Sequence, residues 1–416
     1  MLLNKALSSG ILAVADIPRP KKVGSLDTEK SHPPGRAAHA KEFERPLGAG
    51  LAFRILQTDV ELRSVKAEWD RLWAESEAEY FLCNAAIVES WNTIHRPQGA
   101  KLCCAIVMDQ ERLVGALPMI RSRRWAWTVT SPCTPQTSEC YDMIIKRQTG
   151  SSQLAAALMQ KAIEIVRPDW MYFDYVPRGT HLDVAIQAIP WLRIDEMWAG
   201  SAPVSILHAE TDWISYMKSL GREYQRNVAR AKRRLSEQGT VTFEVLRETP
   251  RSLIDWLFEH KQKWSVRTDK RGHWVFSEFY RNFLGALWSS DPRYLTFALK
   301  LDGALIAVKL TAINTTTASV VFATYHEDYR RFSPGSILDE TMVKYIFDNY
   351  RTPDGKFLDI LFGPGVEKFK SHWSRDHAVP VTSFRLVTSR AGAAGIRIKE
   401  LLSDVKSSMS RAPMTQ

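Results

Sequence analysis

The chain has 416 residues, of which 45% are hydrophobic and 25% charged, with a formal net charge of +10. This length predicts about two or three domains with sizeable cores, and the composition is that of a globular protein rather than of a fibrous or wholly disordered one. The positive charge fits an anionic substrate, a nucleic acid or an anionic membrane surface, and it does not choose between them.

The cysteines and the apolar runs bear on metal binding and compartment. All five cysteines lie in the N-terminal half, and they are Cys83, Cys103, Cys104, Cys133 and Cys140. Their odd number and the absence of a Cys-x-x-Cys pair argue against a disulfide framework and a structural zinc site, so we expect no metal. No apolar run is long enough to cross a membrane. The mildly apolar residues 6–15 are broken by Ser8, Ser9 and Gly10, unlike a signal peptide, and we expect a cytoplasmic protein.

The first half of the chain predicts a leader followed by alternating strands and helices. Residues 1–48, rich in Pro, Gly, Lys, Glu and His from about residue 16, predict a disordered leader. Alternation over Leu51–Leu56 predicts a strand, and apolar residues at helical spacing predict a helix over Asp59–Ser76. Four more elements follow: strands at Lys101–Asp109 and Arg112–Arg121, a helix at Ser151–Val166, and a strand at Trp170–Val176.

The second half repeats this order. The predicted elements are a strand at Val241–Leu246, a helical region over Leu253–Leu287 interrupted at Thr268–His273, a hairpin of Tyr294–Leu301 and Ala304–Ala312, a strand at Ala318–Tyr325, a helix at Ser336–Tyr350, and strands at Phe357–Phe362 and Thr382–Thr388. The repetition predicts two similar domains, at residues 49–205 and 206–392, before a basic tail at 393–416. The alternative is that any α/β chain shows such alternation.

The most informative stretch is Ser319–Ser336, a strand that feeds a helix through a short basic loop. Pro334 and Gly335 break the chain, Ser336 can cap the helix, and Asp339 stands near the position of a capping-box acid. Free N–H groups of a first helical turn and the helix dipole attract an anion, and Arg330 and Arg331 lie beside that turn. The alternative is a plain strand–turn–helix with surface arginines.

Two further segments carry charge in an informative pattern. Leu220–Leu235 predicts a helix with one apolar stripe and one basic face, which is either an anion-binding surface or simply a solvated face. In Phe357–Trp373, Asp359 interrupts a buried-looking strand, so its carboxylate needs a partner. Gly363 and Gly365 allow close backbone approach, and Lys370 follows. This segment predicts either a pocket edge or a structural Asp–Lys pair.

The segments at 224–235, 333–335 and 359–373, with His260–Trp264 between the first two, resemble in their order the GNAT-related acyltransferases. That group includes the CelD-like proteins of bacterial cellulose biosynthesis and is similar to the FemAB-type aminoacyl transferases. The resemblance covers roughly residues 51 to 390. No P-loop, GxSxG, HExxH or GxGxxG motif competes with it.

The resemblance implies an α/β (α+β) chain with tandem GNAT-like domains, each a mixed, mostly antiparallel sheet flanked by helices. It also implies an acyl-CoA donor, acetyl-CoA first, bound in the second domain. The donor-binding residues would come from the strand and the loop after it, and they are Phe322, Ala323, Thr324, Arg330, Arg331, Ser333, Gly335 and Ser336. We call Arg330–Ser336 the donor loop. It departs from the usual glycine-rich loop, because Pro334 lacks one N–H donor.

Acyl transfer needs an attacking amine or hydroxyl, a polarised thioester carbonyl and a proton for the leaving thiolate. Strand N–H groups near Thr324 would polarise the carbonyl, and Tyr325 or His326 would move the proton. Asp359 and Lys370 would orient the acceptor. The residues expected to bind the acceptor substrate are Arg226, Arg230, Lys261 and Trp264.

The leading hypothesis is therefore an acyltransferase that moves an acyl group from acyl-CoA to an amine or hydroxyl of a cell-envelope or polysaccharide-related acceptor. The expected partner is an anionic small molecule or glycan precursor, with contact to a membrane surface left open. One alternative is a FemAB-like transferase that uses aminoacyl-tRNA, the only case in which nucleic acid is expected. Another is a non-catalytic basic adaptor with a degenerate GNAT fold.

Overall fold

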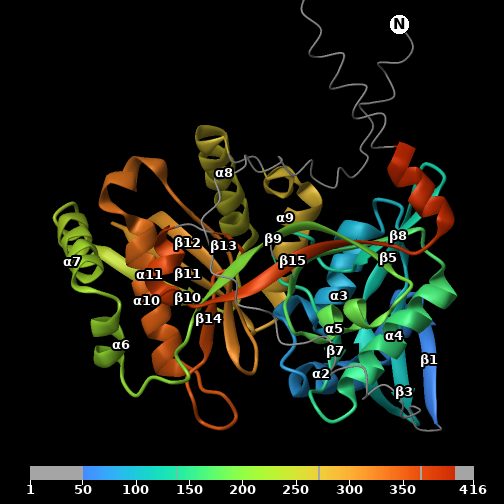
Figure 1. The fold of residues 1–416 in the computed structure, drawn as a ribbon. Coiled ribbons are helices and arrows are strands. Elements are labelled where there is room, and N and C mark those ends of the chain that lie inside the picture. The colour runs from blue at the N-terminus through green and yellow to red at the C-terminus, as the bar shows by residue number, and fades with distance from the viewer. Residues whose placement is uncertain (1–49, 138, 270–271, 366–367, 399–416) are drawn as a thin grey trace, which may run out of the picture. The chain divides into compact units, whose positions relative to one another are not determined.

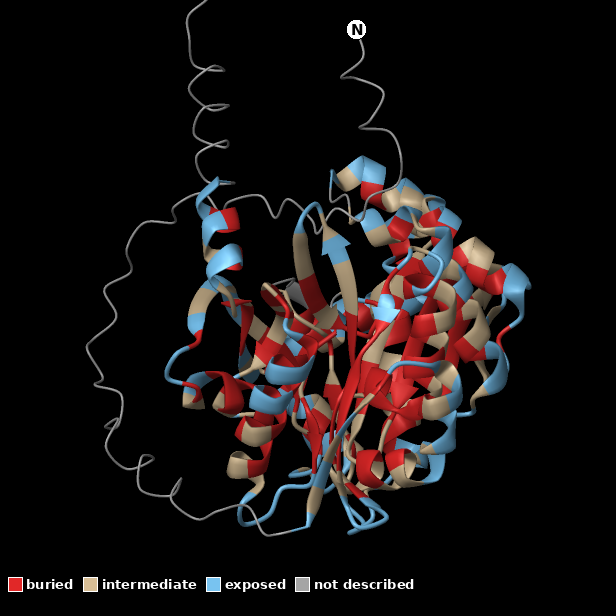
Figure 2. Ribbon diagram, turned by 90° about the vertical axis from the view of Figure 1, so that its right-hand side faces the viewer, coloured by how far each residue is buried: buried red, intermediate tan, exposed pale blue. Residues whose placement is uncertain are grey.

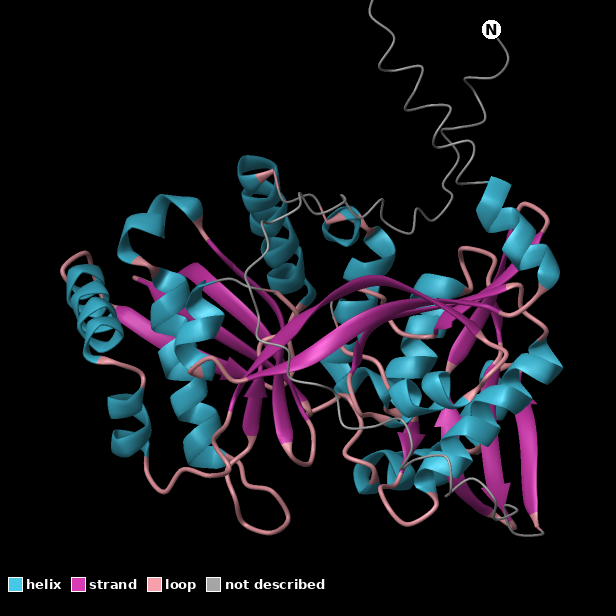
Figure 3. Cartoon of the chain, viewed as in Figure 1, coloured by secondary structure: helices cyan, strands magenta, loops and turns pink. Residues whose placement is uncertain are grey.

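A computed structural model of the chain describes residues 50–137, 139–269, 272–365 and 368–398, all within one compact unit. The predicted leader at 1–48 and residues 399–416 of the predicted tail lie outside this range. Residues 390–398, which include the start of that tail, are helical. Figure 1 shows the arrangement of the elements, and Figure 3 separates strands from helices.

The N-terminal half, up to Ser205, is built from short strands and helices. Its helical elements are α1 (Asp59–Ser64), α2 (Lys66–Glu75), η2 (Tyr80–Leu82), α3 (Asn84–Ser90), η3 (Trp91–His95), α4 (Ser151–Val166) and α5 (His181–Ala188). Its strands are β1 (Leu51–Leu56), β2 (Lys101–Leu102), β3 (Cys104–Asp109), β4 (Arg112–Leu117), β5 (Met119–Arg124), β6 (Trp127–Pro132), β7 (Ile144–Ile145), β8 (Trp170–Pro177) and β9 (Arg193–Ser205).

The C-terminal half follows the same alternation. Its helical elements are α6 (Trp213–Ser219), α7 (Arg222–Ser236), α8 (Arg251–Thr268), η4 (His273–Phe276), α9 (Glu278–Ser290), η5 (Glu327–Phe332), α10 (Pro334–Asn349) and α11 (Lys368–Ser374). Its strands are β10 (Val241–Leu246), β11 (Tyr294–Leu301), β12 (Ala304–Ile313), β13 (Thr317–Tyr325), β14 (Asp359–Leu361) and β15 (Ala378–Val387).

One sheet of eleven strands runs through both halves in the order β10-β11-β12-β13-β14-β9-β15-β8-β6-β5-β2, beside a four-stranded sheet β1-β3-β4-β7. Pairing is antiparallel except at β13–β14 and β6–β8. The long strands β9 and β15 cross the middle of Figure 1 and pair from Ala378–Pro203 to Val387–Arg193. The predicted class, mixed sheets that are mostly antiparallel and flanked by helices, is confirmed.

The apolar core is continuous between the halves. Phe81 packs edge-on against Phe283 with ring centroids 5.2 Å apart. The Tyr294 hydroxyl donates to the carbonyl of Tyr80 at 3.3 Å, and Asn314 Nδ2 donates to the carbonyl of Ala78 at 3.2 Å. Figure 2 shows the buried residues gathered along the sheets and on the helix faces that cover them. Since the halves share one core, the N-terminal half can supply side chains to a site on the C-terminal sheet.

Several boundaries differ from the sequence prediction for local reasons. The helix predicted at Asp59–Ser76 is two helices that meet at Val65. The strand predicted at Arg112–Arg121 is divided by Pro118, which has no N–H for a ladder hydrogen bond. The strand β9 was not predicted, because much of it is exposed and it contains Gly200 and Pro203. No helix within the described ranges is long and apolar enough to span a membrane.

Gly392 lies in the helical segment 390–398, where this segment packs closely against the start of β8. The Trp170 indole donates to the Gly392 carbonyl at 2.8 Å, and a Cβ on Gly392 would lie 2.4 Å from the backbone oxygen of Asp169. We expect Gly392→Ala to lower the free energy of unfolding by about 1–3 kcal/mol, because backbone must shift.

Denaturant unfolding measures this change, with Gly335→Ala as the control for stability. A Cβ on Gly335 would meet only Tyr325 Cδ1, at an ordinary 3.8 Å. Since Gly335 lies in α10, its replacement should be neutral or stabilise by up to about 1 kcal/mol. An unchanged stability of Gly392→Ala would show that this helical segment is not packed as described.

Candidate functional site

The site begins where β13 and β14 part. The two parallel strands pair at Thr317–Asp359, Ala318–Ile360 and Ser319–Leu361 only. Beyond this point β13 continues to Tyr325, whereas the chain after β14 turns toward β9, where the N–H of Phe362 donates to the carbonyl of Pro203 at 3.2 Å. The far part of β13 therefore has a strand partner on its β12 side alone. We call the opening between the two chains the wedge.

A β-bulge lies at the mouth of the wedge. In the pairing of β12 with β13, Leu310 faces Phe322 but Thr311 faces Val320, so Val321 is the extra residue. A bulge locally disrupts the ladder and re-aims the peptide groups. Backbone groups of β13 from Val320 onward can thus point into the wedge. Such preorganised N–H groups are suited to stabilise charge on a reacting carbonyl oxygen.

A cavity of about 20 Å³ lies at the base of the wedge, with room for one water-sized group. The C-terminal half contributes three residues at or next to the bulge, the last paired residue of β14 and a glycine two residues later: Ser319, Val320, Val321, Leu361 and Gly363. The N-terminal half closes the cavity with Glu79, Tyr80, Glu139, Cys140 and Ala202. We call it the wedge cavity.

Two carboxyl groups at this cavity have different surroundings. Glu139 is buried and is held by its own loop, where its carboxylate accepts from the N–H groups of Gln136 at 2.6 Å and Thr137 at 2.9 Å. Glu79 stands just before η2, and desolvation, with smaller effects of Asp142 and Glu139, raises the pKa of Glu79 to about 8. A carboxylate whose pKa lies near neutrality is matched to general-base work.

The other polar groups of the wedge cavity are neutral. Burial raises the pKa of the Tyr80 phenol and of the Cys140 thiol well above their ordinary values. Tyr80 is therefore a neutral hydrogen-bond donor and a weak acid, and Cys140 is not a thiolate nucleophile. Within the described ranges, no group of three or more His, Cys, Asp or Glu residues is placed to hold a metal ion.

The predicted catalytic pair Tyr325 and His326 lies at the other end of β13, about 13 Å along the strand from Val321. Tyr325 is next to Gly335 of the donor loop. The His326 ring is 4.6 Å from that of His260 and 5.5 Å from that of Tyr329. These two residues border the donor loop rather than the wedge cavity.

Asp359 and Lys370, predicted as an acceptor pair, are bonded elsewhere. Asp359 accepts from the N–H groups of Leu207 at 2.8 Å and His208 at 3.0 Å, and from His208 Nδ1 at 2.8 Å. It sits opposite Thr317, about 26 Å along β13 from Tyr325, so one reacting centre cannot hold both residues. Lys370 donates to the carbonyl of Pro364 at 2.8 Å and to that of Gly363 at 3.2 Å, and so holds the turn that borders the wedge cavity.

The donor loop has a different cap from the one predicted. Ser333, with φ of 51°, precedes α10 as its N-cap residue, and Pro334 occupies the first turn, where its missing N–H costs no helical bond. The N–H groups of Ser336 and Ile337 are taken by the Ser333 carbonyl, so Ser336 is not the cap. The N–H of Gly335 has no partner among the described residues.

The predicted capping role of Asp339 also differs from what the structure shows. Asp339 does not cap α10, because it is buried in an ion pair with Lys309 of β12. Arg330 and Arg331 are exposed beside the start of α10. One free amide and two exposed guanidinium groups thus remain for an anion at the donor loop.

The four predicted substrate-binding residues fall into two places. Lys261 of α8 donates to the carbonyl of Ala323 on β13 at 3.1 Å and lies 4.1 Å from the ring centre of Trp264. These two residues therefore border the open edge of β13. Arg226 and Arg230 are exposed on α7, the helix whose Arg234 lies over the Phe332 ring at the donor loop.

Comparisons with known proteins agree with this fold. Residues 222–371 match the family model of the acetyltransferase (GNAT) domain. Among solved structures, FemX aligns with a TM-score of 0.57 and 12% identity, over 80% of this chain and 96% of its own. This likeness shows a shared fold. A search of curated proteins gave no match.

Two other solved structures align less closely. The C-terminal domain of a putative lysylphosphatidylglycerol synthetase from Agrobacterium fabrum has a TM-score of 0.49 and 12% identity, over 83% of this chain and 96% of that one. A tandem GNAT protein from the clavulanic acid biosynthesis pathway has a TM-score of 0.45 and 14% identity, over 82% of this chain and 99% of that one.

Proposed function

We propose that the chain is a GNAT-fold transferase that moves an acyl group, acetyl first, from acyl-CoA to an amine or hydroxyl of a cell-envelope or polysaccharide-related acceptor. The observation that carries this proposal is the wedge cavity. Its lining includes residues of the bulged strand β13 and Glu79, whose pKa is raised to about 8. The strand proposed to bind the donor and the proposed general base therefore border one cavity.

The donor follows β13 in this proposal. Its diphosphate lies against Arg330, Arg331 and the free N–H of Gly335, since these groups can donate charge-assisted hydrogen bonds to phosphate oxygens. Its pantetheine arm runs along the open edge of Phe322–Tyr325, past Lys261. Its thioester carbonyl then reaches Val321 at the wedge cavity.

Glu79 takes part in both proton transfers of this scheme. The Glu79 carboxylate accepts a proton from the attacking amine or hydroxyl, whose nitrogen or oxygen forms a bond to the thioester carbon. Backbone N–H groups beside the bulge stabilise the oxyanion. When the carbon–sulfur bond breaks, the proton that Glu79 took up passes to the leaving thiolate, and the neutral Tyr80 phenol donates a hydrogen bond to that sulfur. In this scheme Tyr325 and His326 contact the donor rather than the reacting centre.

One alternative donor has its own support. The basic face of α7 is exposed next to the donor loop. A polyanion such as aminoacyl-tRNA can contact several cations of this face at once, whereas a small molecule contacts few of them. The same wedge cavity would then accept an aminoacyl ester. The narrower resemblance to CelD-like proteins, and with it the polysaccharide acceptor, stays a prediction.

Calorimetric titration of the full chain with acetyl-CoA, longer acyl-CoAs and aminoacyl-tRNA separates these proposals. We expect acetyl-CoA to bind. Tight binding of aminoacyl-tRNA alone would identify aminoacyl-tRNA, in place of acyl-CoA, as the donor. Binding of none of the ligands would favour a non-catalytic adaptor.

The donor loop gives a specific prediction. Replacing Arg330 and Arg331 together by Gln should weaken acetyl-CoA binding about tenfold or more, because charge-assisted hydrogen bonds are lost. Arg233→Gln, which removes another exposed charge, on α7, is the control and should leave acetyl-CoA affinity unchanged. Equal losses in both variants would mean that only the general positive charge of this region matters.

A further inference from the structure

A second and larger cavity lies in the N-terminal half, where the sheet divides between β2 and β3. Its volume is about 240 Å³, above the roughly 150 Å³ of an engineered cavity that takes up benzene. The end of β1, the start of η3, the β2 segment, β5 and the end of α4 line it: Ile55, Gln57, Trp91, Ala100, Lys101, Leu102, Cys103, Arg121, Ile165 and Val166. It shares none of these residues with the wedge cavity. We call it the N-terminal cavity.

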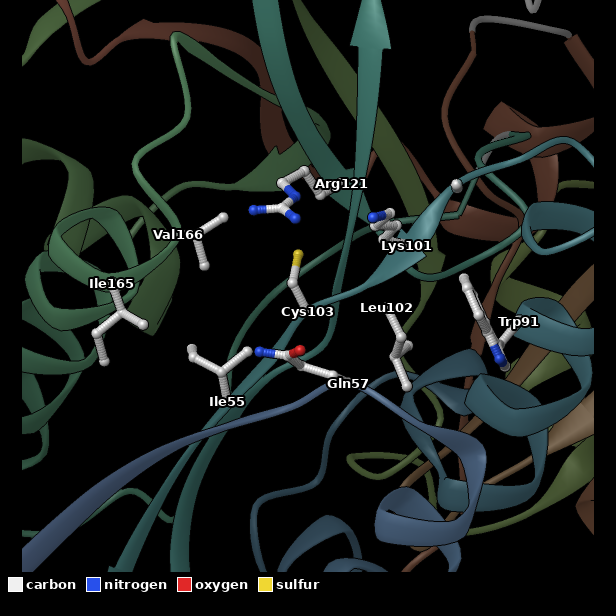
Figure 4. A pocket seen from close by; sticks show the side chains of 10 residues that line it. Ile55, Gln57, Trp91, Lys101, Leu102, Cys103, Arg121, Ile165 and Val166 are labelled. Atoms are coloured by element: carbon white, nitrogen blue, oxygen red, sulfur yellow. The ribbon is translucent and has the colours of Figure 1, made fainter.

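Its polar groups are two cations and an amide. Lys101 and Arg121 are direct partners across the β2–β5 pair, so their side chains lie on one face of the sheet. Figure 4 shows Arg121, Cys103 and Gln57 facing the space between the α4 residues Ile165 and Val166 and the β2 segment. Neither cation has an ion pair or hydrogen bond to any described residue, and no acidic residue lines the cavity.

A pair of unneutralised cations beside a cavity needs an explanation, because like charges on paired strands repel each other. The nearest candidate for a counter-charge within the lining is the Cys103 thiol. Burial raises the pKa of that thiol far above its ordinary value, so the thiol is neutral. The chain itself therefore supplies no anion to this place among the described residues, and a ligand can.

The remaining wall is apolar. Its apolar lining residues are Ile55, Trp91, Leu102, Ile165 and Val166. A ligand that fits must have one anionic end and one apolar body. A carboxylate fits better than a phosphate ester, because the doubly charged phosphate loses more hydration against such a wall, and because the planar Arg fork matches a carboxylate.

We propose that the N-terminal cavity binds a small carboxylic acid with an apolar body slightly larger than benzene, whose carboxylate lies between Arg121 and Lys101 and whose body lies against Ile55, Trp91 and Val166. This site is separate from the donor and acceptor positions of the proposed transfer. The proposed ligand binds there and takes no part in the transfer reaction.

Titration calorimetry of the full chain with 3-phenylpropionate tests the proposal, and 3-phenylpropanol and phenyl phosphate are the comparison ligands. We expect 3-phenylpropionate to bind and the uncharged alcohol to bind at least about tenfold more weakly, since it forms no charge-assisted hydrogen bond. Arg121→Gln should weaken 3-phenylpropionate binding by about tenfold or more, and Lys101→Gln by less, because Lys101 is exposed.

Arg123→Gln is the matched control, since Arg123 is on β5, two residues from Arg121, and does not line the cavity. It should leave the affinity unchanged. The proposal is overturned by no binding of 3-phenylpropionate, by equal binding of acid and alcohol, by tighter binding of phenyl phosphate, or by equal effects of Arg121→Gln and Arg123→Gln. If Arg121→Gln does not fold, Lys101→Gln takes its place in the comparison, because Lys101 is exposed. An affinity of Lys101→Gln equal to that of Arg123→Gln would then overturn the proposal.

Discussion

Replacing Glu79 by Gln is expected to lower the rate of acyl transfer by about 10²- to 10⁴-fold, the usual contribution of a general base. Gln keeps the shape of the side chain but cannot accept the acceptor's proton. The change should fall on kcat and leave the affinity for acetyl-CoA intact, because Glu79 lies at the wedge cavity and not at the donor loop. The rate is measured as CoA thiol release from acetyl-CoA with a panel of amino sugars and hydroxyl sugars.

The pH profile distinguishes a base from a merely structural residue. Because burial raises the pKa of Glu79 to about 8, the wild-type rate should rise about tenfold per pH unit below that value and level off above it. Glu79→Gln should lose this rise. Stability should change in the opposite sense: folding favours the protonated carboxyl, so the stabilisation is complete below the ordinary pKa of 4.5 and is lost as the pH rises through about 8.

Glu77→Gln is the control for both measurements, since Glu77 is exposed in the turn two residues before Glu79. It should match the wild type in rate and in pH profile. A Glu79→Gln enzyme with the wild-type profile would remove Glu79 from the proposed reaction. Should His326→Ala then show the loss instead, the proton transfer would return to the end of β13, as the sequence predicts.

The elements around the donor loop could be predicted because their signals are local. The alternation over Ala318–Tyr325, the Pro334-Gly335 break and the apolar periodicity that follows are all read within one stretch, and β13 and α10 are where they predict them. The cap was misplaced by three residues, because a serine with positive φ before Pro334 has no distinct sequence signal.

The wedge cavity could not be predicted, because its walls are distant in sequence. Glu79 and Val321 line the same cavity because the two halves share one core, in which Phe81 packs on Phe283. The one local hint was an acid directly before the apolar run Tyr80–Leu82. Asp359 shows the reverse error: its need for a partner was predicted, but the backbone of Leu207 and His208 meets that need in place of Lys370.

Breaking the buried ion pair between Lys309 and Asp339 is expected to have the largest effect on stability. Both side chains are only 5% exposed, and they join β12 to the second turn of α10. Asp339→Leu should lower the free energy of unfolding by about 3–5 kcal/mol, because it removes the Asp339 carboxylate from a buried ammonium group. Lys309→Met should cost less, since burial already raises the pKa of Asp339 and the remaining carboxyl can take up a proton.

The double variant Lys309→Met with Asp339→Leu should recover most of this loss, because two apolar side chains of similar size fill the place of the pair. Denaturant unfolding followed by tryptophan fluorescence measures all three variants. Lys344→Met breaks the exposed Lys344–Asp348 pair on the same helix and is the control, with an expected cost below about 1 kcal/mol. A cost of Asp339→Leu no greater than this control would contradict a buried ion pair.

The same pair also connects stability to the donor site. Lys309 faces Ala323 across the β12–β13 ladder, on the strand that the donor is proposed to follow, and Asp339 fixes the helix that begins at the donor loop. The double variant keeps the packing but loses the directional bond between them. We therefore expect it to fold and yet bind acetyl-CoA more weakly than the wild type, whereas Lys344→Met keeps full affinity. Wild-type affinity in the folded double variant would show that packing alone positions α10.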